Sequence, residues 1–229
     1  MHNEVKDKVF ELLVKDKSGH GIDHVSRVHN LSLKFAKQEN ANNRTVSLTA
    51  LLHDVDDYKL VGKKSAEQLF HAKDIMKKCG IDSNTQNDVL ENIRRMGFSK
   101  YLKGIRPETL EGKIVSDADM CDGMGASGII RSIVYSVSDK GNGVIFDRNI
   151  FPNIDITAEE YNVKGTVHDT DNAINYFFEK LLKLKDIMLT KSGRKEGEKR
   201  QKIMIDFLRN FFEEENVDEK WFNLVKDLK

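Results

Sequence analysis

Two histidines and several aspartates lie on otherwise apolar faces of the expected helices. His24 recurs at helical spacing with apolar residues, and His53 ends an apolar run and is followed at once by Asp54. Residues 116–122 place further acids inside another apolar segment. A buried carboxylate is costly unless a cation or strong hydrogen bonds compensate its charge. Two imidazoles and two carboxylates around one ion meet that need, and such mixed ligands suit Mn²⁺, Fe²⁺, Co²⁺, Ni²⁺ or Zn²⁺ better than Ca²⁺.

The acid that completes the set is either Asp117 or Asp119. On a helix, Asp119 shares a stripe with Val115 and Asp122, whereas Asp117 shares its stripe with Lys113. The apolar side of the helix therefore favours Asp119 as the ligand. Asp122, one turn further on, is then expected to hydrogen-bond to a ligand rather than to the metal.

The elements that must position these residues are helices. Only two prolines occur in the chain, and helical periodicity runs through most of it. We expect Thr45 and Ser83 to cap helices, and residues 192–193 to break one. The apolar run before His53 predicts a central, buried helix. The expected helices cover about residues 5–17, 24–38, 45–52, 63–78, 83–95, 108–121, 125–137, 170–189, 194–215 and 218–228.

Residues 139–167 differ from the rest of the chain. They contain several glycines and aspartates, one proline and short β-prone runs. We expect a long irregular loop or a small hairpin, inserted in one domain that spans residues 1–229. Its catalytic core would cover about 19–138 and its C-terminal helices about 168–229. A loop of this length is often functional, and this one is expected to help form the pocket wall. Trp221 is expected to pack into the protein rather than against a partner.

Composition narrows the class of protein. Lysine and arginine balance aspartate and glutamate at 37 each, which argues against a dedicated nucleic-acid partner. The first residues are charged and lack an apolar signal core, and no apolar stretch is long enough for a membrane span. Cys79 and Cys121 lie far apart and suggest no disulfide framework. We therefore expect a cytoplasmic protein with no membrane partner, and the composition leaves the oligomeric state open.

The order of the candidate ligands resembles the signature of a known family. His24, then His53-Asp54 in a Leu-Leu-His-Asp-Val context, then Asp119 after an alanine, is similar to the H…HD…D motif of HD-superfamily phosphohydrolases. The resemblance is strongest over residues 19–126. It extends more weakly to the C-terminus, where the chain looks like a bacterial subgroup of stand-alone HD proteins. The resemblance implies an all-α HD-domain helical bundle, and the alanine before Asp119 again selects that residue over Asp117.

The resemblance also implies a chemistry. HD-superfamily members hydrolyse phosphoester or phosphoanhydride bonds, and a nucleotide substrate of the nucleotidase or nucleoside triphosphate pyrophosphatase type is expected here. One divalent ion (Mn, Mg, Co, Ni, Fe or Zn) would be held by His24, His53, Asp54 and Asp119. Two-metal members carry extra histidines after the HD pair, and this chain offers only His71 in that interval. One metal is therefore expected.

Two acids are candidates for catalysis. The resemblance gives Asp54 a catalytic role besides metal binding and puts an acidic residue near the attacking water. Asp57 follows His53 by four residues and would share its face if the helix continues. Asp57 would then orient the water or take its proton. The alternative is a solvent-exposed acid at a helix C-terminus.

The substrate phosphate needs positive or hydrogen-bonding partners. Arg27, Lys59 and Lys63 surround the HD pair in the sequence and are the candidates, although a single lysine is more often only a solvated side chain. His20 precedes His24 by four residues and either reaches the site or lies in a loop. His29, His71 and His168 are expected to lie outside the ligand set.

Three other interpretations compete with a phosphohydrolase. The first is a nucleotide- or metal-binding sensor domain that keeps the HD fold without turnover, although such a domain has no need for a complete ligand set. The second is an oxygenase with an iron pair, which needs more ligands than the chain offers. The third is a helical bundle whose core histidines are merely hydrogen-bonded, which one histidine alone would suggest but four grouped residues do not.

Overall fold

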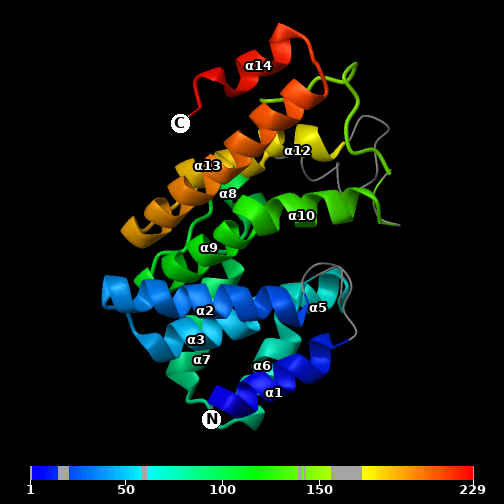
Figure 1. The fold of residues 1–229 in the computed structure, drawn as a ribbon. Coiled ribbons are helices and arrows are strands. Elements are labelled where there is room, and N and C mark those ends of the chain that lie inside the picture. Colours follow the sequence, from blue (N-terminus) through cyan, green and yellow to red (C-terminus); the bar gives the residue numbers. More distant parts are fainter. Residues whose placement is uncertain are drawn as a thin grey trace. The chain divides into compact units, whose positions relative to one another are not determined.

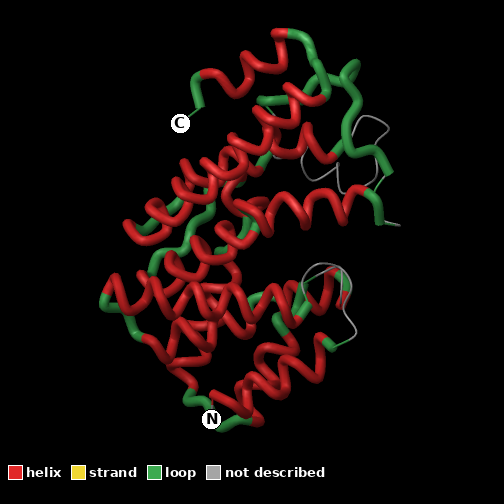
Figure 2. The backbone as a smooth tube through the Cα atoms, in the orientation of Figure 1, coloured by secondary structure: helices red, strands yellow, loops and turns green. Residues whose placement is uncertain are grey.

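Helices form all the regular structure that the computed structural model describes, which covers residues 2–14, 21–57, 61–138, 141, 143–155 and 172–228. No strand occurs among these residues (Figure 2). The predicted all-α class is therefore confirmed. The chain divides into two compact units, one formed by Met1–Asp119 with Leu189–Gly193 and the other by Met120–Met188 with Arg194–Lys229. None of the described helices is both long and apolar enough to cross a membrane.

The first unit is built around one short buried helix, α3. This helix spans Asn43–Leu52, and every residue from Thr45 onward is buried. It packs against α1, α2 and α7 (Figure 1). Leucines of α3 join apolar residues of α1, α6 and α7 in a single core. The predicted central position of this segment is confirmed. The helices of this unit are α1 (His2–Leu13), α2 (Ile22–Glu39), α3, α5 (Lys63–Gln68), α6 (Phe70–Lys78), α7 (Ser83–Arg94), α8 (Phe98–Leu102) and most of α9 (Leu110–Asp122).

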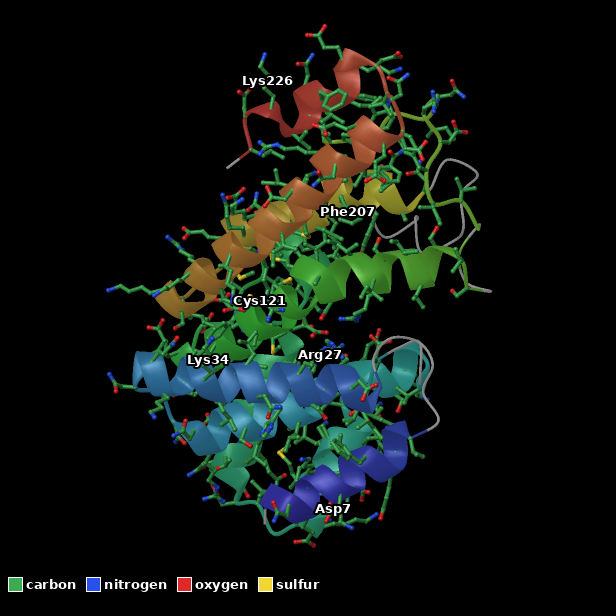
Figure 3. The ribbon with its side chains drawn as sticks, in the orientation of Figure 1. Asp7, Arg27, Lys34, Cys121, Phe207 and Lys226 are labelled. Atoms are coloured by element: carbon green, nitrogen blue, oxygen red, sulfur yellow. The ribbon has the colours of Figure 1, made fainter. Side chains whose placement is uncertain are left out.

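The second unit has an aromatic core. Trp221 is fully buried, and its ring lies 5.1 Å from that of Phe146 and 5.6 Å from that of Phe212, measured between centroids. Phe207 belongs to the same helix as Phe212 (Figure 3). The expectation that Trp221 packs into the protein is confirmed. The elements are α10 (Gly125–Ser136), α12 (Ala173–Glu179), the 3-10 helix η1 (Leu181–Ile187), α13 (Lys191–Glu214, which begins in the first unit) and α14 (Glu219–Lys226).

Both predicted N-caps were wrong by one to three residues. Asn42 caps α3, and its side chain accepts hydrogen bonds from the N–H groups of Arg44 and Thr45. Asp82 caps α7 and accepts from Thr85 N–H over 2.9 Å. This bond, followed by one from the Thr85 hydroxyl, holds the pKa of Asp82 below its ordinary value. Each segment offers several good caps in a row, and the side chain that reaches free N–H groups three residues on is the one used.

Two helices expected to be continuous are interrupted. The segment predicted as 63–78 consists of α5 and α6, separated at Leu69, whose φ of 51° lies in the left-handed region. Leu69 is nevertheless buried in the core, so packing offsets the strain of this conformation. The segment predicted as 170–189 consists of α12 and η1 in its described part. No glycine or proline marks either break in the sequence.

The expected loop is only partly described. Residues 143–155 are irregular and contain no strand, and much of 139–167 lies outside the described residues. Within the described part, Asn175 Nδ2 donates to the carbonyl oxygen of Ile150 over 3.0 Å. The Asn153 N–H donates to Glu179 over 3.1 Å. Residues near 150 are therefore fastened to α12.

The predicted break at residues 192–193 was wrong, because both residues lie inside α13. The start of α13 is held by two acids of the first unit. Asp117 accepts hydrogen bonds from the N–H groups of Leu189 and Thr190 over 2.8 to 3.1 Å. Glu39 accepts from Ser192 N–H over 2.7 Å and from its hydroxyl. Bonds from the Ser192 hydroxyl and N–H hold the pKa of Glu39 below its ordinary value.

Gly193 is required by this arrangement. A Cβ atom at this position would lie 2.2 Å from Oδ2 of Asp117 and 2.7 Å from the Asp117 Cβ. These distances are far below van der Waals contact, and Asp117 is fixed by its hydrogen bonds. Gly197, one turn later in the same helix, differs: a Cβ there would meet its nearest atoms at 3.5 Å, which is ordinary contact.

We predict opposite effects of alanine at these two glycines. Gly193→Ala should lower the free energy of unfolding by about 1–3 kcal/mol, because the methyl group overpacks the site against Asp117. Gly197→Ala should raise it by up to about 1 kcal/mol, because alanine favours helix and fits the available space. Urea denaturation of both variants measures the difference. Equal effects at the two positions would contradict the packing of Gly193 against Asp117.

Candidate metal centre

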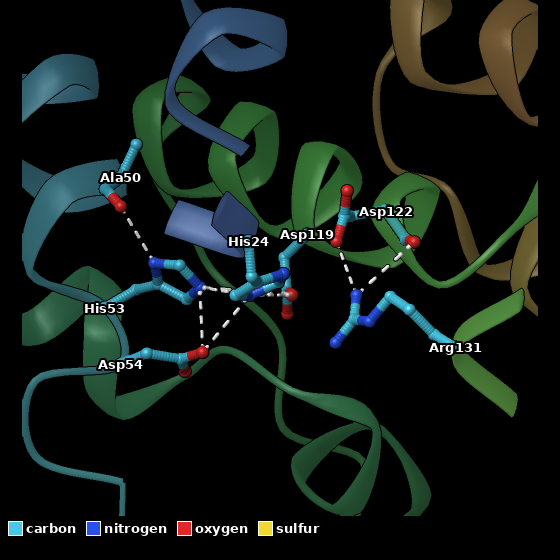
Figure 4. Close-up of polar contacts among 7 residues, drawn as sticks. All are labelled: His24, Ala50, His53, Asp54, Asp119, Asp122 and Arg131. Carbon is cyan, nitrogen blue, oxygen red and sulfur yellow. Dashed lines mark hydrogen bonds and ion pairs between the residues drawn. The ribbon is translucent and has the colours of Figure 1, made fainter. Parts of the chain in front are cut away.

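His24 and His53 face each other through their Nε2 atoms. His24 lies in the first turn of α2 and is buried, and His53 occupies the C-cap of α3. Their Nε2 atoms are 3.2 Å apart, and their ring planes are tilted by 57° (Figure 4). The contact joins residues 29 positions apart in the sequence. It follows from the packing of α2 on α3, which brings the start of one helix to the end of the other.

The tautomer of His53 is set by the backbone. Its Nδ1 lies 2.8 Å from the carbonyl oxygen of Ala50. Because a carbonyl oxygen can only accept, Nδ1 carries the hydrogen in this bond. In the neutral ring, Nε2 then has a lone pair directed at His24, which is the form that binds a metal ion.

Two carboxylates complete the cluster. Oδ2 of Asp54 lies 3.1 Å from Nε2 of His24 and 3.4 Å from Nε2 of His53. Oδ1 of Asp119, from α9, lies 3.5 Å and 4.0 Å from the same two nitrogens. The Asp54 and Asp119 side chains are 14% and 26% exposed, so the cluster is mostly shielded but reachable. The four predicted ligands therefore meet at one place.

These spacings fit a shared divalent ion. Donor atoms bound to one ion at about 2.1 Å lie about 3.0 Å apart at right angles and about 3.4 Å apart at tetrahedral angles. Most of the observed separations fall close to this range. One donor atom each from His24, His53 and Asp119 lies within 4.8 Å of the others, as metal binding requires. Two carboxylates and two neutral imidazoles also balance a charge of +2.

Asp117 and Asp119 are separated by one residue and have different surroundings. The Asp117 carboxylate is buried and accepts three hydrogen bonds from Thr190 and Leu189 main-chain N–H groups, together with one from the Thr190 hydroxyl over 2.7 Å. Asp119 points at the histidines. Asp117 therefore fastens the chain at Leu189 and Thr190. The choice of Asp119 as the metal ligand stays a prediction, and the apolar-side argument alone does not explain it, because Asp117 is the more buried residue.

The structure places the remaining acids as follows. Asp122 is buried, and its carboxylate forms an ion pair with Arg131 in the second unit (Figure 4). Its expected contact with a metal ligand stays a prediction.

Asp57 was expected to share a helical face with His53 if the helix continued. The helix does not continue, because α3 ends at Leu52 and residues 53–56 form turns. Asp57 therefore does not follow His53 on a helical face, and its catalytic role also stays a prediction.

Of the basic residues expected near the substrate phosphate, only Arg27 has a described side chain. Arg27 is exposed on α2, one turn after His24 (Figure 3). His20 and Lys59 lie outside the described residues, as does the side chain of Lys63. Among the other histidines, His29 contacts the Ser47 hydroxyl through Nε2 at 2.8 Å, and His168 lies outside the described residues.

The sequence analysis missed Asp56. This residue is buried, and its carboxylate accepts hydrogen bonds from the N–H groups of His71 and Ala72. Its neighbour Val55 is fully buried, so the chain turns both residues inward. An apolar residue followed by an acid in a predicted buried segment was the available signal.

Comparison with known proteins decides the family. A model of the HD domain matches residues 21–124, which contain all four clustered residues. The Bacillus subtilis protein YpgQ is 31% identical over 209 residues, which is 90% of this chain and 89% of YpgQ.

The chain belongs to the HD superfamily. An HD-superfamily hydrolase from Bacillus thuringiensis is 30% identical, with a TM-score of 0.71, covering 95% of this chain and 97% of its own. A Lactobacillus plantarum protein is 32% identical with a TM-score of 0.78 and the same coverage. YpgQ in complex with ADP aligns at 26% identity with a TM-score of 0.67, covering 93% and 94%. As an HD-superfamily member, the chain is a metal-dependent phosphohydrolase.

Asp117 and Asp119 of α9 should respond differently to alanine substitution. Asp119→Ala should lose most of its metal affinity while unfolding like the unaltered protein, because a half-buried ligand is removed from one end of the cluster. Asp117→Ala should keep the metal but lose at least about 2 kcal/mol of stability, because buried N–H donors are left without an acceptor. Isothermal titration with Mn²⁺ and urea denaturation separate the two effects. Loss of metal in Asp117→Ala with retention in Asp119→Ala would reverse the assignment.

Proposed function

We propose that this HD-superfamily protein hydrolyses a phosphoanhydride or phosphoester bond of a nucleotide, using one divalent ion held by His24, His53, Asp54 and Asp119. The observation that carries the proposal is the convergence of these four side chains within 3.1 to 4.0 Å of the histidine Nε2 atoms. A divalent ion bound there would polarise a phosphoryl oxygen and lower the pKa of water.

The residues around the cluster have separate tasks. The Ala50 carbonyl orients His53 by accepting from Nδ1, which keeps the lone pair of Nε2 directed at the cluster. Asp54 contributes its carboxylate from the turn that follows α3. Asp57, three residues after Asp54 in the same turn, is only partly exposed and donates its N–H to the Asp54 carbonyl over 3.1 Å. We assign Asp57 the task of taking a proton from the attacking water.

A nucleotide is favoured over other phosphorylated compounds by one comparison. YpgQ, which shares most of its length with this chain, binds ADP in its crystal structure. A nucleotide phosphate chain needs cationic partners, and a guanidinium matches phosphate oxygens with two parallel hydrogen bonds. Arg27 is three residues after His24, on the same side of α2, and is the described cation proposed for this contact.

The proposal predicts metal-dependent turnover that needs His53. Metal-stripped protein is given Mg²⁺, Mn²⁺, Co²⁺, Ni²⁺ or Zn²⁺ singly, and phosphate and pyrophosphate release is measured on a panel of nucleoside mono-, di- and triphosphates. We expect release with at least one metal, and a loss of about 100-fold or more in His53→Ala, because a ligand of the ion is removed.

His29→Ala is the matched control, because His29 is also a half-buried histidine of this unit but contacts Ser47. It should retain activity. Tight binding of one ion per chain without release from any nucleotide would contradict hydrolysis and favour the sensor interpretation.

A further inference from the structure

Asp56 makes an unusually complete set of contacts for an acid that lies beside a metal ligand in sequence. Its side chain is almost fully buried. Oδ1 accepts from the His71 N–H over 3.0 Å and contacts His71 Nδ1 at 2.8 Å, and Oδ2 accepts from the Ala72 N–H over 2.9 Å. All three partners belong to the first turn of α6. Both oxygens are therefore used, and both are directed at one helix N-terminus.

The chemistry of this contact explains why the residue is a carboxylate. The first N–H groups of a helix have no partner within the helix, and the helix dipole places positive charge there. Leu69, at the N-cap of α6, has no side-chain group that can accept from them. Asp56 supplies two acceptor oxygens and a negative charge from a distant part of the chain. Because a carboxylate only accepts, Nδ1 of His71 is the donor in the third bond.

The turn that carries Asp54 depends on outside support. Residues 53–57 lie beyond the end of α3, so no helical ladder holds them. Within the turn, the Val55 N–H donates to Leu52 over a long 3.4 Å, and the Asp57 N–H donates to Asp54 over 3.1 Å. The next two side chains after Asp54 are both anchored: Val55 packs in the core of the first unit, and Asp56 bonds to α6.

We propose that Asp56 is a positioning residue, which fastens the turn 53–57 to α6 and thereby keeps Asp54 directed at the metal position, with His71 holding the Asp56 carboxylate in place. Asp56 lies two residues from a ligand and does not belong to the ligand set itself. A shift of this turn would move the Asp54 oxygen away from the histidine nitrogens that lie 3.1 and 3.4 Å from it. Asp56 therefore acts through Asp54.

The inference rests on the metal centre of the proposed function, and its readout is the affinity for Mn²⁺ alone. Asp56→Ala should weaken Mn²⁺ binding, measured by isothermal titration, by about 10- to 100-fold, the usual effect of removing a group that orients a ligand. His71→Ala should weaken it less. His71→Asn should restore it, because the asparagine amide nitrogen can replace Nδ1 as the donor to Asp56.

Asp82→Ala is the matched control. Asp82 also bonds to the first turn of a helix in this unit, through Thr85, but lies far from the ligands in the sequence. Both cap removals should lower the melting temperature, Asp56→Ala by more, because it leaves buried N–H groups without an acceptor, whereas the Asp82 side chain is 55% exposed. Only Asp56→Ala should change the affinity for Mn²⁺.

The proposal is overturned if Asp56→Ala binds Mn²⁺ as tightly as the unaltered protein, or if Asp82→Ala weakens binding equally. If Asp56→Ala does not fold, the two His71 variants provide the test. The proposal is then overturned if His71→Ala, His71→Asn and the unaltered protein bind Mn²⁺ with equal affinity. Weakened binding in Asp56→Ala, in a protein that releases phosphate from no nucleotide, would support the positioning role and reject only the proposed function.

Discussion

The mutual approach of four electron-pair donors is the constraint on which the rest of this structure depends. Two imidazole nitrogens and two carboxylate oxygens repel one another when nothing positive lies among them, and partial burial strengthens that repulsion because water screens it less. Their separations nevertheless remain close to those of ligands that share one ion. The packing of α2 on α3 and the hydrogen bond from His53 to the Ala50 carbonyl help to keep these donors together.

Each donor is held by a different kind of local structure. His24 lies inside a helix, where the stripe of buried side chains on α2 sets its direction. His53 and Asp54 come just after the end of α3, so one is oriented by a backbone carbonyl and the other by the turn. Asp119 lies on α9, two residues after an acid that fastens the Leu189–Gly193 segment to the same unit. Two residues of α9 that are separated by one position therefore have different roles: Asp119 contributes to the cluster, and Asp117 binds the Leu189–Gly193 segment.

Much of this arrangement could be predicted from the sequence, and the exceptions have physical causes. Helical periodicity located most helices. The choice of Asp119 over Asp117 from the apolar side of α9 stays a prediction, because Asp117 is the more deeply buried of the two. The expected end of this helix at residue 52 agrees with the end of α3 at Leu52, so the condition set for Asp57, that the helix continue beyond His53, was not met. The break at Leu69 and the continuous helix at Gly193 both depend on contacts with distant residues, which the local sequence does not reveal. Leu69 packs into the core, and Asp117 and Glu39 hold the start of α13. Asp56 was missed because its partners are 15 and 16 residues away.

The most direct test of the account is the position of a bound ion. Crystals grown with Mn²⁺ would show it in an anomalous difference map recorded near the manganese absorption edge. The account predicts a single strong peak per chain, in contact with His24, His53, Asp54 and Asp119. A peak that contacts Asp117 instead of Asp119, or one away from the two histidines, would contradict it.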